Sequence, residues 1–380
     1  MERILHIGKF SSCQLGGIET VINDFIVGLN PFFHIVKLTA NANFSTEIIE
    51  RKGYLEYNVP LAAVLARTPC CPTMPFYLRK LHKKYKFSLV HLHFPNPMAH
   101  MASLVLPASV KRVISWHSDI IYQKKALRYY QPWVNSLLKR VHAVIVASSF
   151  LTEKSSQLSI AKQRNIIHHI PYGIQMDFFL RSDYEEKIKH IREQFSRHFL
   201  VFALGRHVTY KGFSYLIEAM VHLPTNCILL LGGEGPLTLS LKMQVKALQL
   251  EQRVYFLGQI AQNELAAYYH ACDVFCLPSI DQNEAFGIVQ IEAMACAKPV
   301  ISCDIYEGAG QVNQDGLTGL VVPARSPTSL AKAILKLYDE PLLGKTFGKA
   351  AYRYIKEKFT YSLMLQRLKI LYEGVLQKTP

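Results

Sequence analysis

Short apolar runs alternate with amphipathic segments along most of this chain, and the pattern occurs twice. The first half contains runs such as RILHIG, SLVHLHF and AVIVAS, and the second half contains CILLLGG, DVFCLP and PVISC. Amphipathic segments such as ETVINDFIVGLN and SYLIEAMVHL lie between them. Strands that alternate with helices predict βαβ units, and near-continuously apolar strands predict parallel sheets covered on both faces. We therefore expect an α/β protein with two doubly wound, Rossmann-like domains that face each other across a cleft.

The segment 175–198 interrupts this rhythm, because it is more polar and more charged than either flank. A chain of 380 residues, half of them hydrophobic, suits two domains of common size. We place an N-terminal domain at 1–175 and a C-terminal, ligand-binding domain at 176–360. The helical tail at 361–380 is expected to pack back on the first domain.

Composition excludes several classes of protein. Charged residues make up 19% of the chain and aromatic residues 11%, which excludes extended disorder. No apolar run is long enough to span a bilayer, and MERILHIGKF reads as a first strand instead of a secretory signal. We expect a cytoplasmic protein. Its eight cysteines lack zinc-site spacing and are interpreted as small buried hydrophobes.

Positive charge suggests an anionic partner. The formal charge is +15, and basic clusters occur at 82–86 (HKKYK) and at 124–140. The second cluster mixes Lys and Arg with Tyr, Leu and Trp, which is typical of a surface that lies on an anionic membrane. An ordinary solvated helix face is the alternative, and Pro132 is expected to kink or divide the helix. No helix, finger or RNP pattern of nucleic-acid binding is present, so we expect no nucleic acid.

Two glycine-containing loops are candidate anion sites. Gly16 and Gly17 lie between a strand and a helix, where backbone N–H groups approach an anion, although a tight turn explains them equally well. In the second half, a strand runs into Gly205 and Arg206, and Lys211 precedes the next helix. The guanidinium fork and the compact ammonium together match a diphosphate. Two solvated surface cations are the alternative interpretation.

Two glutamates form the most specific motif. Glu284 and Glu292 are eight residues apart, so in one helix they would be offset by about 12 Å. They are too far apart to share a proton and are spaced to contact two ends of an elongated ligand. A helix is expected to begin near Phe286, and its free N–H groups favour a phosphate. The apolar neighbours of Glu292 mean that its carboxylate needs a partner.

Three histidines raise the question of a metal. His91, His93 and His117 are expected at strand ends of the first domain, and His-x-His on a strand places two rings on one face. No carboxylate or second pair completes a zinc site, so we predict no metal and assign His91 and His93 to packing.

Together these motifs resemble glycosyltransferase family 4, which has the GT-B fold. The resemblance rests on the glycine pair, GRHVTYKG, GEGP, and EAFGIVQIE followed by AMACAKPVIS, with WHSD at 116–119 and PYGI at 171–174. It covers nearly the whole chain and implies a retaining, nucleotide-sugar-dependent transferase that needs no metal, because its cations do the electrostatic work.

The resemblance also implies residue roles. Arg206 and Lys211 would bind the donor diphosphate and stabilise its charge as it leaves. Glu284 would contact the donor sugar, Glu292 the ribose hydroxyls, and His117 would lie near the sugar. The implied catalytic set is His117, Arg206, Lys211 and Glu284. The donor-binding set adds Gly16, Gly17, Gly205, Phe286, Gly287, Ile288, Val289 and Glu292.

WHSDIIYQKKALRYY and EAFGIVQIEAMACAKPVIS resemble bacterial mannosyltransferases of polysaccharide and O-antigen assembly, within lipopolysaccharide biosynthesis. This implies GDP-mannose as donor and a lipid-diphosphate-linked glycan as acceptor at the inner face of the cytoplasmic membrane. A UDP-sugar is the alternative donor. The alternative functions are an epimerase of the same architecture and a non-catalytic protein that binds polyanions or membranes.

Overall fold

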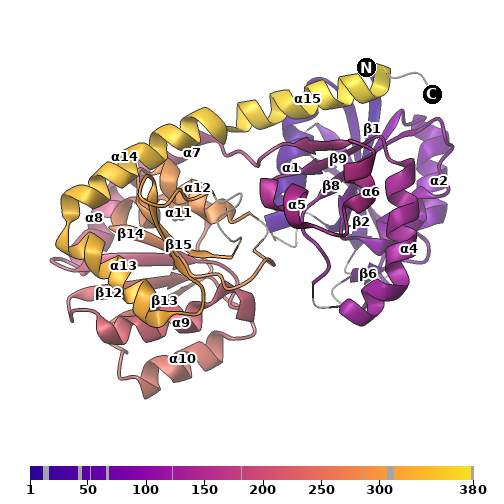
Figure 1. Ribbon diagram of the computed structural model, residues 1–380. Helices are drawn as coiled ribbons and strands as arrows, with labels where there is room; N and C mark the ends of the chain where they lie inside the picture. Colours follow the sequence, from indigo (N-terminus) through magenta and orange to yellow (C-terminus); the bar gives the residue numbers. More distant parts are fainter. Residues whose placement is uncertain are drawn as a thin grey trace. The chain divides into compact units, whose positions relative to one another are not determined.

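A computed structural model divides the chain into two compact units (Figure 1). Unit 1 comprises 1–172 and 363–380, and unit 2 comprises 173–362. The structure describes residues 1–11, 17–41, 45–51, 53–65, 68–121, 123–180, 182–284, 286–305 and 312–377.

Unit 1 is built on an eight-stranded sheet in the order β10-β9-β8-β7-β1-β2-β4-β3, in which only the β3–β4 pair is antiparallel. Its strands are β1 (Arg3–Phe10), β2 (His34–Asn41), β3 (Glu47–Arg51), β4 (Tyr54–Pro60), β7 (Leu89–Phe94), β8 (Lys111–Trp116), β9 (Ala143–Val146) and β10 (Ile167–His169). β5 (Ala63–Leu65) and β6 (Thr68–Cys70) pair as a separate two-stranded antiparallel sheet.

The helices of unit 1 are α1 (Gly17–Leu29), α2 (Met74–Tyr85), α3 (Pro97–Ser103), α4 (Lys124–Arg140), α5 (Ser149–Lys154), α6 (Ser159–Gln163) and most of α15 (Tyr361–Gln377). Alternate strand residues serve opposite faces of the sheet. Leu5 and Leu92 join the apolar core shared with α2, α3 and α4. His6 and His91 face the other way, where Phe25 of α1 and Tyr372 of α15 contact His91.

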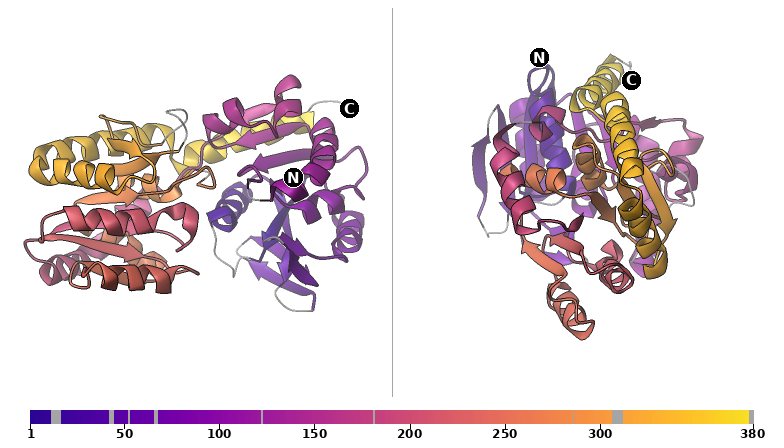
Figure 2. Two further views of the ribbon diagram at one scale, coloured as in Figure 1. Left: turned by 60° about the horizontal axis from the view of Figure 1, so that its bottom comes forward. Right: turned by 90° about the vertical axis from the view of Figure 1, so that its left-hand side faces the viewer.

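Unit 2 is built on a six-stranded parallel sheet in the order β13-β12-β11-β14-β15-β16, with helices on both faces (Figure 2). Its strands are β11 (Phe199–Leu204), β12 (Cys227–Gly232), β13 (Val254–Gly258), β14 (Val274–Leu277), β15 (Val300–Asp304) and β16 (Gly319–Pro323). Its helices are α7 (Met176–Phe179), α8 (Glu185–Gln194), α9 (Phe213–Ala219), α10 (Thr238–Ala247), α11 (Gln262–Ala271), α12 (Ile288–Ala295), α13 (Pro327–Asp339) and α14 (Pro341–Lys358), with 3-10 turns at Ser182–Tyr184, Thr209–Lys211 and Met220–His222.

The predicted α/β fold with two parallel sheets is confirmed, because the apolar runs quoted above form strands of these sheets. The expectation that Pro132 kinks or divides its helix is wrong as to division, because α4 runs continuously from Lys124 to Arg140. No helix in the described part of the chain is long and apolar enough to cross a membrane.

The chain passes from one unit to the other at two places, after Tyr172 and after Ser362. On the unit 2 side the two passages lie side by side, because Ile174 donates to the Phe359 carbonyl and Tyr361 donates to the Ile174 carbonyl, both at 2.9 Å. These backbone hydrogen bonds tie the two connecting segments together.

Candidate functional site

The strand order of unit 2 reverses between β11 and β14, which are neighbours in the sheet. β12 and β13 lie on one side of this pair, and β15 and β16 lie on the other. The loops that follow two such strands lead to opposite faces of the sheet, which leaves a crevice between them at the carboxyl ends of the strands. Ligands of open α/β sheets bind in this crevice. Arg206, Lys211 and Glu284 all lie in these two loops.

The two loops are held against each other by backbone contacts. Ile280 donates to the Tyr210 carbonyl at 2.8 Å. Gly212 has a φ of 66°, and a Cβ at this position would lie 2.0 Å from the Pro278 carbonyl oxygen. Only glycine fits a left-handed conformation with so close an approach. Gly212 therefore sets how closely Lys211 approaches the loop after β14.

Lys211 and Glu284 form a buried ion pair. The Lys211 Nζ lies 2.6 Å from Glu284 Oε2, and Ser279 Oγ donates to the same carboxylate oxygen at 2.7 Å. Lys211 is 8% exposed and Glu284 7%. A small pocket is lined by Ser279, Glu284 and Gln290. The structure thus brings Lys211 and Glu284 together, and it adds Ser279, which sequence reasoning missed.

Charge balance explains why this lysine stays protonated. Burial acts to lower the pKa of Lys211, but the Glu284 carboxylate, together with Tyr210, outweighs it and leaves the pKa raised. Breaking a buried pair by removing one partner leaves an uncompensated charge, which costs about 3–5 kcal/mol. An incoming anion lets Lys211 divide its donors between that anion and Glu284, since an ammonium has three.

Arg206 contrasts with Lys211. It follows Gly205 directly after β11, is exposed, and has no ion-pair partner among the residues that the structure describes. Its guanidinium is therefore available to an anion at the same strand ends. The loop after β11 thus offers one exposed cation without an ion-pair partner, Arg206, and one buried cation that is paired, Lys211.

Glu292 lies in the second turn of α12 and is bonded to the preceding helix. Tyr269 of α11 donates to Glu292 Oε2 at 2.7 Å. Burial raises the pKa of Glu292, and the Tyr269 hydrogen bond only partly opposes this. The carboxylate has a partner, as its apolar surroundings require. Tyr269 lies 23 residues earlier in the sequence, and no motif links the two positions.

Helix α12 begins at Ile288, two residues later than expected, with Gly287 as a left-handed N-cap at φ 76°. Phe286 is buried against Phe359. The amides of Ile288 and Val289 belong to the first turn, which has no intrahelical acceptors. This turn is the part of the motif that offers N–H groups to an anion. Ala285 lies outside the described residues.

The remaining predicted site residues lie in unit 1. Gly17 opens α1, while Gly16 lies outside the described residues. His117 follows β8 and is 3% exposed. Its Nε2 lies 3.0 Å from His93 Nδ1 and its Nδ1 lies 2.5 Å from the Tyr172 hydroxyl. Both ring nitrogens of His117 are therefore used within unit 1.

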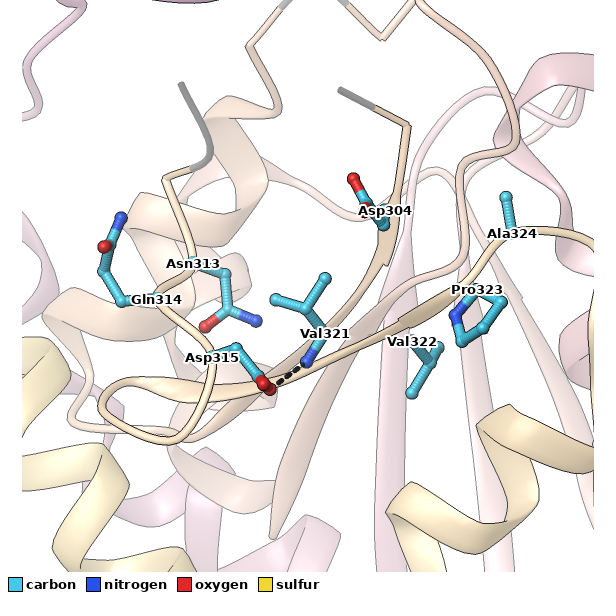
Figure 3. Close-up of a pocket in the computed structure, with 8 residues that line it drawn as sticks. All are labelled: Asp304, Asn313, Gln314, Asp315, Val321, Val322, Pro323 and Ala324. Atoms are coloured by element: carbon cyan, nitrogen blue, oxygen red, sulfur yellow. Dashed lines mark hydrogen bonds between the residues drawn. The ribbon is translucent and has the colours of Figure 1, made fainter. Parts of the chain in front are cut away.

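A larger pocket of unit 2 does not suit a phosphate. It lies beside β15 and β16 and has a volume of about 530 Å³ (Figure 3). Asp315 Oδ1 accepts from the Val321 amide at 2.8 Å, and Asp304 contributes a second carboxylate. Among the described residues that line this pocket, none is Lys or Arg. Its charge favours neutral, hydroxyl-rich groups over a diphosphate.

Comparisons with known proteins identify the family. The family model for Glycosyltransferase Family 4 matches residues 15–178, and the model for Glycosyl transferases group 1 matches residues 185–354. The O-antigen chain mannosyltransferase C of Escherichia coli is 28% identical over 80% of this chain and 81% of its own length. The D-rhamnosyltransferase WbpZ of Pseudomonas aeruginosa is 28% identical over 94% of this chain and 92% of its own.

Solved structures agree on the fold. Sucrose-phosphate synthase from Thermosynechococcus elongatus superposes with a TM-score of 0.81 at 23% identity, covering 99% of each chain. At this identity the likeness shows the GT-B fold, and the two family models, which together span most of the chain, show the family. The chain belongs to glycosyltransferase family 4 and is a retaining glycosyltransferase.

Proposed function

We propose that this enzyme transfers mannose from GDP-mannose to a lipid-diphosphate-linked glycan in polysaccharide or O-antigen biosynthesis. The buried Lys211–Glu284 pair beside the unpaired Arg206 carries the proposal, because it supplies both a fixed and an available cation for a departing diphosphate. The name of the E. coli relative, an O-antigen chain mannosyltransferase, supports the sugar and the pathway. An O-antigen pathway supplies acceptors on a lipid carrier at a membrane surface.

In the proposed mechanism, the donor diphosphate lies over the first turn of α12 and between the two cations. Arg206 and Lys211 neutralise the charge that grows on the diphosphate as the sugar–oxygen bond breaks, and no metal is required. Ser279 and Lys211 hold Glu284 in one orientation, so that its second oxygen is directed by these bonds toward a sugar hydroxyl. Glu284 then stabilises positive charge on the sugar. Glu292 accepts from the ribose hydroxyls, and the family resemblance implies that His117 of unit 1 also acts on the sugar.

Two other functions are separable from this one. A UDP-sugar donor uses the same diphosphate and ribose contacts, so only the base and the sugar distinguish it. A non-catalytic protein on this scaffold has no need of Arg206, Lys211, Glu284 and Glu292 together. The presence of all four favours an enzyme.

A donor panel tests the substrate. A ligand that binds only the folded protein stabilises it by RT ln(1 + [L]/Kd). We expect GDP-mannose to raise the melting temperature more than UDP-glucose or UDP-N-acetylglucosamine at equal concentration. Stabilisation by a UDP-sugar alone would instead establish the UDP alternative, and stabilisation by none would favour the non-catalytic one.

Replacing Arg206 tests the diphosphate contact without disturbing the fold. Because Arg206 is exposed and unpaired, R206A should leave the melting temperature unchanged and lower kcat by about 10²–10³, the usual effect of removing one donor to a developing charge. K211A is a poorer probe, since it leaves Glu284 buried and unpaired. R353A, an exposed arginine on α14, is the matched control. Near-normal turnover of R206A would remove Arg206 from the mechanism.

Glu292 should make nucleotide affinity pH-dependent. Its carboxylate accepts ribose hydroxyls only when ionised, and its pKa is raised by burial, so GDP affinity should fall as pH drops, starting above the usual range of a glutamate near 4.3. E292Q should weaken GDP about 10–100-fold at neutral pH and flatten this dependence. Calorimetric titration with GDP at several pH values measures both the affinity and its pH dependence. The control variant is E264Q on α11. A 2′,3′-dideoxy nucleotide should bind without the dependence; an unchanged slope would exclude the ribose contact.

Two helices of unit 1 provide a surface for the membrane that such an acceptor implies. Val134, Leu137 and Leu138 anchor α4 in the core, and its exposed side carries Lys125, Arg128, Lys139 and Arg140 with Tyr129 and Trp133, which are 80% and 56% exposed. Helix α2 packs on the same face of the sheet, and its exposed side carries Phe76, Arg79, Lys80, Lys83 and Lys84. Each cation near an anionic leaflet contributes about 1 kcal/mol.

Vesicle sedimentation tests this surface. The protein should pellet with phosphatidylglycerol vesicles at low salt, be released at high salt, and ignore phosphatidylcholine vesicles, because charge attraction is screened beyond about 10 Å at 0.1 M salt. The double variant K125E/R128E should bind severalfold less than K345E/K349E, which makes the same charge change on exposed positions of α14. Equal loss in both variants would show that net charge, and not this surface, drives binding.

A further inference from the structure

Seven polar side chains of unit 1 form one continuous series of hydrogen bonds on the sheet face that α1 and α15 cover. We call this series the histidine chain. Its members in order are Ser115, His91, Tyr372, His6, His93, His117 and Tyr172. All seven are between 0% and 7% exposed.

Strand register explains how four histidines meet. β1, β7 and β8 are parallel neighbours, with His6 paired to His91 and His93 paired to Ser115. Residues two apart on a strand share a face, so His91 and His93 lie side by side with ring centroids 4.4 Å apart. His117 continues the face of Ser115 just past β8. Sequence reasoning singled out His91, His93 and His117 but missed His6 and both tyrosines.

Every ring nitrogen of the four histidines has a partner. His91 Nε2 lies 2.8 Å from Ser115 Oγ, and its Nδ1 lies 2.5 Å from the Tyr372 hydroxyl. That hydroxyl lies 3.2 Å from His6 Nε2, and His6 Nδ1 lies 3.1 Å from His93 Nε2. The two bonds of His117 complete the series.

Burial keeps these rings neutral. It lowers the pKa of His6 to about 3, with help from the charge of Lys37, and the pKa of His117 to about 3, with help from Lys9. The pKa values of His91 and His93 are lowered well below the usual value for the same reason, and neighbouring rings add to it. A neutral imidazole has one N–H and one bare nitrogen.

This requirement makes the chain directional. If His6 donates to His93, then His93 must donate to His117, and His117 must donate to Tyr172. If His117 donates to His93 instead, every other bond reverses as well. If one bond had the opposite direction from the rest, two N–H donors or two bare acceptors would face each other away from water. Such unsatisfied buried groups cost about 1–3 kcal/mol of stability.

We propose that the histidine chain couples the tautomer of His117 to those of His6, His91 and His93, with His6, His93 and Tyr372 as positioning residues that act on His117 from up to three hydrogen bonds away. Tyr372 is the linking member, because its hydroxyl can donate to one histidine while it accepts from the other, and so joins His91 to His6. Through Tyr372, helix α15 takes part in setting which nitrogen of His117 carries the proton. The tautomer itself does not depend on the proposed function; only its effect on sugar transfer does.

A metal ion is the competing explanation for His6, His91 and His93, whose ligand atoms lie within 4.8 Å of one another. The ring orientations argue against this explanation, however. His91 and His93 are stacked with an interplanar angle of 24°, and His6 and His93 with 26°. The nitrogen lone pairs of stacked rings lie in nearly parallel planes. A tetrahedral metal ion instead requires the lone pairs of its ligands to point at one position, about 2 Å from each nitrogen.

The test uses the full chain labelled with ¹⁵N in histidine. Long-range ¹H–¹⁵N spectra distinguish an N–H from a bare ring nitrogen, and H117N assigns the His117 signals. Y372F removes one hydroxyl and keeps the ring, so it should shift the His117 ring-nitrogen signals although residue 372 does not contact them. The matched control is Y130F, since Tyr130 bonds to the buried His100 at 3.0 Å on the opposite face and outside the chain.

The reciprocal variant is Y172F. It should shift the ring-nitrogen signals of His6, although the rings of His117 and His93 lie between Tyr172 and His6 in the series. Melting temperatures show that each variant is folded. If Y372F alters only His6 and His91, and Y172F alters only His117, the effects are local and the proposal is wrong. Elemental analysis adds an independent check: one equivalent of a transition metal, lost in H6N but kept in H100N, would also overturn it.

Activity separates this proposal from the proposed function. If His117 contacts the sugar, Y372F should lower kcat with little change in the donor KM, since no donor contact is removed. Shifted His117 signals with unchanged kcat would leave the histidine chain intact and remove His117 from the transfer mechanism.

Discussion

The ion pair between Lys211 and Glu284 is the contact on which the site of unit 2 depends. Two buried charges are tolerated only when each has a partner, and here a third group, Ser279, donates to the same carboxylate oxygen as Lys211. The pair exists because β11 and β14 are neighbours and because Gly212 lets their loops touch. The same topology that leaves a crevice at the strand ends therefore supplies the charges that line it.

Sequence reasoning found what is local and missed what is distant. Residues close together in the chain determine the strands, the helices and the motifs around Arg206, Lys211 and Glu284. The sequence pattern therefore predicts them. It does not predict the contacts of Tyr269 and Tyr372, because they reach their partners across 23 and 281 positions. Helix α4 shows a different limit. Packing of Val134, Leu137 and Leu138 outweighs the backbone hydrogen bond lost at Pro132, and helix propensities do not include such tertiary packing.

The two units solve the problem of buried polarity in opposite ways. Unit 2 keeps full charges and balances them, which suits a site that must attract an anion. Unit 1 keeps the four histidines of the histidine chain neutral and joins them into one series, which suits groups whose orientation matters more than their charge. Unit 1 also contains a buried ion pair, between Lys37 and Glu56, with a separation of 3.2 Å.

The position of Tyr372 also has a consequence for how the protein is made. Unit 1 begins the chain, yet one of its central hydrogen-bonding groups lies in α15, which the ribosome reaches only after all of unit 2. Domains generally fold in the order of their synthesis. Here the second unit can be complete first, while in the nascent first unit one ring nitrogen of His6 and one of His91 still lack the Tyr372 hydroxyl. Translation speed through residues 173–362 therefore sets how long that unfinished core is exposed to chaperones and proteases.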